Sequence, residues 1–213
     1  MKTAIATLII AIAAAAPAAA QPEPTVSVRA FGLVTAQRFA ARQTFDATLG
    51  SSTGLFAGGG LEFVDSRGWF LDVEVSHFSK DGQRVFVADD QTFPLGIKDT
   101  VSITPIDLLL GYRLHLGRSG RVRPYAAIGL TSIGYTEKSD FSESSDDVDK
   151  RKGGPMFVGG LEVHIAPLLS VSADVAATRV TGILGSSATA ASTVFGEDDA
   201  GGVAARVRVI IGR

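Results

Sequence analysis

Cysteine is absent from this chain of 213 residues. Disulfides, thiolate metal sites and the lipid-modified cysteine of a lipoprotein are therefore all excluded. Histidine is scarce too, with three residues, so we expect no transition-metal site and no cofactor. The formal net charge is only −2, which argues against nucleic acid as a partner.

Long apolar runs are missing beyond residue 20, so the sequence predicts no membrane-spanning helix there. A spanning barrel remains possible, because its strands need only alternate. The first 20 residues have the layout of a secretory signal peptide: Lys2, an apolar stretch, and a small-residue end at Ala18-Ala19-Ala20. We therefore predict a signal peptide over 1–20 and a single domain over 21–213.

Eight segments alternate with period two and are separated by Gly, Asp, Ser and Pro, which predicts eight β-strands. They span Thr25–Thr35, Gly54–Val64, Trp69–Phe78, Ser102–Leu116, Arg123–Thr136, Pro155–Ala166, Leu169–Thr181 and Gly202–Gly212. Long connections (36–53, 79–101, 137–154 and 182–201) alternate with short ones (65–68, 117–122 and 167–168). This rhythm predicts an all-β fold, an eight-stranded antiparallel up-and-down transmembrane β-barrel with four mobile external loops.

Two faces are visible in WFLDVEVS, residues 69–76, where apolar residues alternate with Asp72 and Glu74. Most predicted strands have one uninterrupted apolar face. The charges on the alternate faces are Arg29, Glu62, Asp72, Glu74, Asp107, Arg113, Glu162, Asp174, Arg206 and Arg208. The predicted strands use Arg and no Lys, and Arg is suited to buried pairing with carboxylates. We expect these ten charges to fill the lumen as a structural network, with the apolar face toward lipid.

One strand and the aromatic residues are harder to assign. Over Arg123–Thr136 neither face is cleanly polar, and Gly129 is a candidate bulge or change of phase. Aromatic residues near strand ends predict two girdles at the membrane surfaces. The predicted members are Phe63, Trp69, Tyr112 and Tyr125 at the short-turn end, and Phe78, Tyr135 and Phe157 at the other. His115 and His164 are expected on the lumen side.

Two alternatives belong to other functional classes. A soluble periplasmic lipocalin-like barrel would turn the apolar face inward around a ligand. A lipid-modifying enzyme would use His77 and Ser79, which lie on the outward face and resemble the His-x-Ser motif of lipid A deacylase barrels. Such a His needs a third group to orient it, and no acid occupies a matching position on a neighbouring strand. We therefore predict no enzyme activity.

The acidic residues of the long connections lack the spacing of a Ca²⁺ loop, so no metal site is predicted.

The stretch GYRLHLGRSGRVRPYAAIGL, residues 111–130, carries a resemblance. A strand ending in Tyr-Arg, a short basic turn, Arg-Pro-Tyr and a Gly-containing strand resemble the outer-membrane β-barrel domain family, the small barrels related to OmpA and OmpX. The resemblance extends over Gln21 to Arg213 and implies the outer membrane of a Gram-negative bacterium. It further implies outer-membrane lipids as surroundings and insertion by the barrel-assembly machinery. The implied role is envelope integrity or surface recognition of an unknown extracellular or host ligand, with no shared catalytic residue.

Overall fold

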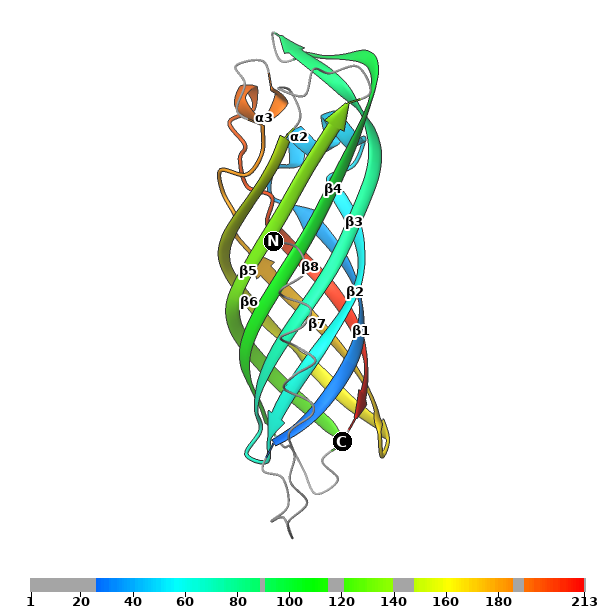
Figure 1. The fold of residues 1–213 in the computed structure, drawn as a ribbon, viewed down its shortest axis with the longest axis vertical. Coiled ribbons are helices and arrows are strands. Elements are labelled where there is room, and N and C mark those ends of the chain that lie inside the picture. The colour runs from blue at the N-terminus through cyan, green and yellow to red at the C-terminus, as the bar shows by residue number, and fades with distance from the viewer. Residues whose placement is uncertain (1–25, 89–90, 115–120, 140–147, 186–189, 213) are drawn as a thin grey trace, which may run out of the picture.

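Eight antiparallel strands close into a barrel in chain order, with β8 paired back to β1 (Figure 1). The computed structural model describes residues 26–88, 91–114, 121–139, 148–185 and 190–212, so residues 1–20, the predicted signal peptide, lie outside them. The strands are β1 (Val26–Phe39), β2 (Thr53–Asp65), β3 (Trp69–Ala88), β4 (Gln91–Arg113), β5 (Val122–Ser139), β6 (Val148–Ala166), β7 (Leu169–Thr178) and β8 (Gly202–Gly212). The predicted eight-stranded up-and-down barrel is confirmed.

An apolar band surrounds the outside of the barrel. On β8 it runs from Val203, which is 57% exposed, to Ile211, which is 61% exposed. This distance is roughly 27 Å along the strand at ~3.4 Å per residue. A strand tilt of about 40° reduces it to ~20 Å of height, close to the ~25 Å band of outer-membrane barrels. The apolar face is therefore outside, opposite to its place in a soluble ligand-binding barrel.

Four strands continue well beyond this band at the end opposite the short turns (Figure 1). The predicted connection 79–101 is mostly strand, because β3 and β4 pair with each other as far as Ala88 and Gln91. The connection 137–154 is shortened in the same way by β5 and β6. Lys80, Lys98, Lys138, Lys150 and Lys152 lie in these extensions. The prediction that the strands contain no Lys is therefore wrong for the complete strands. It holds only for the part of each strand that lies in the membrane.

The other two predicted loops contain helices, α2 (Arg42–Leu49) and α3 (Ala191–Val194). No helix in the described ranges is long and apolar enough to cross a membrane. Phe45 of α2 stacks on Phe39 with 4.1 Å between ring centroids. The apolar plug, as we name this cluster inside the external end of the barrel, consists of Phe39, Ala41, Phe45, Leu49, Phe56, Phe78, Val101, Ile103, Ile133, Tyr135, Val180, Ile183, Leu184 and Ala200. The described residues of these two segments are therefore packed rather than mobile.

Strand β5 alternates without interruption. Tyr125, Ala127, Thr131 and Ile133 are buried inside the barrel, and the register with β4 and β6 does not shift at Gly129. The suggested bulge at Gly129 is wrong. A methyl group on Gly129 would lie 2.0 Å from the Leu108 carbonyl oxygen, so the glycine permits close approach of β4 and β5 instead.

The prediction of a membrane-surface position is wrong for three of the girdle residues. Phe78, Tyr125 and Tyr135 are only 6%, 5% and 3% exposed, and they point into the barrel rather than toward the membrane surfaces. They lie at the level of the strands where a girdle is expected, but the period-two alternation places their side chains on the inner face. The remaining four, Phe63, Trp69, Tyr112 and Phe157, are exposed on the outside. Trp69 and Tyr112 form an edge-to-face pair with centroids 5.2 Å apart.

Candidate functional site

All ten predicted lumen charges lie inside the barrel, and none is more than 7% exposed. Four of them form a neutral ring toward the short-turn end, here named the lower quartet: Arg29, Glu62, Arg113 and Glu162. Arg29 donates from Nε to Glu62 at 2.6 Å, and from Nη1 and Nη2 to the two Glu162 oxygens at 2.8 and 3.0 Å. Arg113 pairs with the same two glutamates from the opposite side. Each charge is therefore shared between two partners, which offsets the cost of its burial.

The other six charges form the upper cluster: Asp72, Glu74, Asp107, Asp174, Arg206 and Arg208. Arg206 on β8 pairs with Glu74 and Asp174. Arg208 Nη1 donates to Asp72 Oδ2 at 2.7 Å. Asp107, by contrast, forms no ion pair among the described residues. The upper cluster is thus less completely paired than the lower quartet.

Aromatic rings complete this interior, and the sequence analysis did not predict them there. Tyr125 accepts a hydrogen bond from Arg208 Nη2 at 2.6 Å and donates one to Asp174 at 2.5 Å. The Arg113 guanidinium lies over Phe70, 4.2 Å from the ring centroid, and that of Arg208 is 5.2 Å from the Phe31 centroid. Such cation–π contacts suit desolvated guanidinium groups. Phe31 and Phe70 occupy inward positions in the period-two alternation of their strands, and their place inside the barrel could have been predicted from that alternation.

Of the two histidines predicted on the lumen side, only His164 is among the residues that the structure describes. His115 lies outside the described residues. His164 lies near the lower quartet, with Nδ1 3.4 Å from Glu162 Oε1 and 3.1 Å from Ser170 Oγ. These contacts are polar interactions at the mouth of the barrel rather than a metal-binding arrangement.

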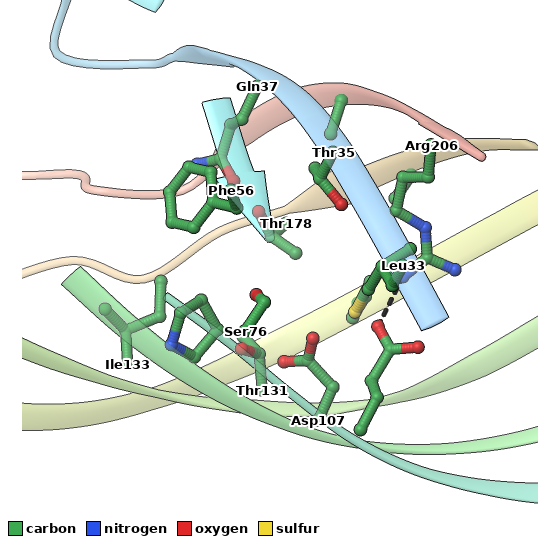
Figure 2. Close-up of a pocket in the computed structure, with 15 residues that line it drawn as sticks. Leu33, Thr35, Gln37, Phe56, Ser76, Asp107, Thr131, Ile133, Thr178 and Arg206 are labelled. Carbon is green, nitrogen blue, oxygen red and sulfur yellow. Dashed lines mark hydrogen bonds and ion pairs between the residues drawn. The ribbon is translucent and has the colours of Figure 1, made fainter. Parts of the chain in front are cut away.

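A small cavity separates the upper cluster from the apolar plug (Figure 2). Its volume is about 30 Å³, enough for roughly one or two water molecules. Polar side chains of Ser76, Asp107 and Thr131 line it together with Ile133 and Phe56. From the short-turn end outward, the lumen therefore contains the quartet, the upper cluster, this cavity and the plug, with no wide passage in the part of the chain that the structure describes.

The elements above the band form what we name the external crown: α2, α3 and the part of the β3–β4 hairpin beyond Ser79 and Ser102. Phe86 and Phe93 are directly paired across this hairpin. They are 43% and 46% exposed, and Leu95 nearby is 50% exposed. Because these side chains lie far above the lipid band, lipid does not account for their exposure. Apolar groups exposed in this way are typical of interaction sites.

His77 and Ser79 lie on the outer surface, as predicted, but each contacts a hydroxyl group on β4. His77 Nδ1 is 2.9 Å from Thr104 Oγ1, and Ser79 Oγ is 3.0 Å from Ser102 Oγ. No carboxylate hydrogen-bonds to His77 in the described part of the chain. Without such a group the histidine is not oriented as general base for Ser79.

Comparison with known proteins identifies one family. The family model described as "Outer membrane protein beta-barrel domain" matches residues 4–207. No curated protein sequence matches the chain.

Several solved structures share the fold. Neisserial surface protein A has a TM-score of 0.56 and 11% identity, over 90% of this chain and 99% of that one. Ail, the attachment invasion locus protein of Yersinia pestis, solved with the heparin analogue sucrose octasulfate, has a TM-score of 0.50 and 9% identity, over 88% and 96%. OprG from Pseudomonas aeruginosa has a TM-score of 0.50 and 12% identity, over 88% and 93%. At these identities the likeness concerns the fold alone.

Proposed function

This chain belongs to the outer membrane protein beta-barrel domain family, and from that premise we propose that it acts in surface recognition, with the barrel as anchor and the external crown as binding element. The protein is an integral outer-membrane β-barrel. The observation that carries the proposal is the exposed pair Phe86–Phe93 on the external hairpin. A filled lumen supports neither conduction nor storage of an organic ligand.

The hairpin offers backbone groups as well as apolar side chains. Among the described residues, β2 pairs with β3 as far as His77, and β5 pairs with β4 from Asp99 onward. From Val85 to Ala88 and from Gln91 to Pro94, the two strands pair with each other alone in the described residues. Strand edges that are unpaired within the described residues, beside exposed apolar side chains, are suited to pairing with an extended segment of another protein. We therefore propose a protein as the partner, in contrast to the sulfated sugar bound to Ail.

Adherence of bacteria tests this role. Cells that express the wild-type protein, the double variant Phe86→Ser/Phe93→Ser, or no protein are compared for binding to one another and to an epithelial monolayer. We expect the double variant to behave like the null strain, and Thr92→Ala, on the same hairpin, to behave like wild type. Heat-dependent electrophoretic mobility confirms that each variant is folded.

A structural role in the envelope gives a different result. In that case the null strain is sensitive to detergent, the double variant restores resistance completely, and adherence is equal in all strains. This outcome would overturn the recognition role. Export through a signal peptide over residues 1–20, insertion by the barrel-assembly machinery and the absence of enzyme activity are parts of the same proposal.

A further inference from the structure

The upper cluster carries more negative than positive charge. The lower quartet balances Glu62 and Glu162 against two guanidinium groups. In the upper cluster, Arg206 and Arg208 are the only cations for Asp72, Glu74, Asp107 and Asp174, as far as the described residues show. Two carboxylates are therefore left without a positive partner of their own. In a water-poor interior such a surplus needs a neutralising group.

The surplus is concentrated at one point of the barrel wall. Glu74 and Asp107 are direct neighbours across β3 and β4, an arrangement that is repulsive for two like charges. Glu74 Oε2 and Asp107 Oδ1 are fully buried and have no hydrogen-bond partner among the described residues. The two residues are 2% and 7% exposed. Glu74 is paired with Arg206 through Oε1, but neither of these two oxygens is hydrogen-bonded by the described residues or reached by bulk water.

Both carboxylates line the cavity below the apolar plug. Ser76 and Thr131 also line this cavity (Figure 2), and the Thr131 side chain hydrogen-bonds to the Asp107 carboxylate. Thr35 and Gln37 line the cavity too. All of these side chains offer oxygen, and carboxylate, hydroxyl and amide oxygens are the ligands of hard cations.

We propose that this cavity is a binding site for one divalent cation of the Ca²⁺ type, held by Glu74 and Asp107 with Ser76 and Thr131 as neutral ligands. The surplus of two negative charges equals the charge of such an ion. Mg²⁺ keeps several waters in a strict octahedron, for which a cavity of about 30 Å³ has no room. Ca²⁺ accepts irregular sets of protein oxygens. A water beside the ion would also accept a hydrogen bond from Arg206 Nη2, which has no partner among the described residues.

The metal content of folded protein tests the site. Wild type, Asp107→Asn, Ser76→Ala and Asp81→Asn are folded in detergent with Ca²⁺, washed with a chelator, and analysed for calcium by atomic emission. We expect about one Ca²⁺ per barrel in wild type. Asp107→Asn should lose it, whereas Asp81→Asn, a change at an exposed ion pair with Lys98, should retain it. Ser76→Ala leaves every charge in place, so its faster loss of calcium would identify a ligand even if Asp107→Asn folded poorly.

Stability provides a second readout. Wild type should unfold at a higher temperature in Ca²⁺ than in chelator, and this difference should vanish in Asp107→Asn. Equal calcium in wild type and Asp107→Asn, together with unfolding temperatures independent of Ca²⁺, would overturn the proposal. A protonated-carboxyl infrared band present in wild type and lost in Asp107→Asn would overturn it too, because protons would then neutralise the surplus.

Discussion

Glu197 caps the N-terminus of α2 through Thr44. Its Oε2 accepts hydrogen bonds from the Thr44 backbone N–H at 2.8 Å and from the Thr44 hydroxyl at 2.9 Å. Oε1 accepts a third from the Gln43 N–H at 3.2 Å. Ala41, at the N-cap position, has no side-chain acceptor of its own, so the cap comes from a distant part of the chain. This contact joins the two inserted segments into one closure over the external mouth.

Replacing Glu197 by Ala should loosen that closure without unfolding the barrel. Loss of a helix cap costs about 0.5–2 kcal/mol. We expect the backbone amides of α2 to exchange with deuterium roughly 2- to 30-fold faster, which is the same free energy expressed as a rate ratio. Amides of β8 should be unaffected. Asp198→Ala, at an exposed neighbouring position, serves as the control, and equal α2 exchange in both variants would show that Glu197 is not the cap.

Removing Arg206 should destabilise the whole barrel. Its guanidinium pairs with both Glu74 and Asp174, and Arg206→Ala would leave the buried Glu74 without a cation and Asp174 with Arg208 alone. Breaking a buried pair from one side costs about 3–5 kcal/mol. Urea unfolding in lipid vesicles measures this cost directly. Arg67→Ala, in an exposed turn, should change stability by less than about 0.5 kcal/mol. An unchanged midpoint for Arg206→Ala would show that the pairing does not stabilise the fold.

The membrane part of the fold could be predicted because lipid imposes a simple rule. Each outward position there must be apolar, so alternation in residues 69–76 places Asp72 and Glu74 inside. The direction of the Tyr125 side chain could not be predicted in this way, because the neighbouring small residues Ala126, Ala127 and Gly129 do not show which positions of the strand face inward. Its inward direction becomes evident only when β4 and β6 fix the register of β5.

The external crown could not be predicted by the same rule. Above the band water contacts the outer face, so strand extensions tolerate polar residues there, as with Ser79 and Ser102. Segment 36–53 has no local N-cap residue for α2, because the capping group, Glu197, lies 153 residues away from Thr44. The individual ion pairs of the lumen could not be predicted either. Alternation identifies the residues of the inner face, but not which carboxylate each arginine contacts.

Asp99 should make stability depend on pH. It lies on β4 roughly 24 Å along the strand beyond Ile106, outside the lipid band, and is 1% exposed. Burial, reinforced by the neighbouring Glu137, raises the pKa of Asp99 from 3.8 to about 8. The folded protein therefore binds a proton that the unfolded chain releases between about pH 4 and 8. This group's contribution to stability must decrease as pH rises through that window.

Asp99→Asn removes this titration. Unfolding midpoints measured from pH 5 to 9 should decline less steeply in the variant than in wild type, and the variant should be the more stable protein at pH 8. Asp149→Asn, at an exposed position on β6, is the matched control and should follow the wild-type slope. Parallel curves for all three proteins would mean that the Asp99 carboxyl titrates alike in the folded and unfolded states.

Two adjacent glycines on β6 provide the sharpest comparison of inner and outer face. A methyl group at Gly160 would lie 2.4 Å from Asp174 Cβ and 2.5 Å from the Ala173 carbonyl oxygen, whereas one at Gly159 would meet nothing within 4 Å. Gly160→Ala must therefore displace the β7 backbone and the carboxylate that binds Arg206. Overpacking of this kind costs about 1–3 kcal/mol. Gly159→Ala adds apolar surface toward lipid and should leave the unfolding midpoint in vesicles unchanged or slightly raised. Equal effects of the two changes would contradict the close contact between β6 and β7, because the same chemical change is made one residue apart.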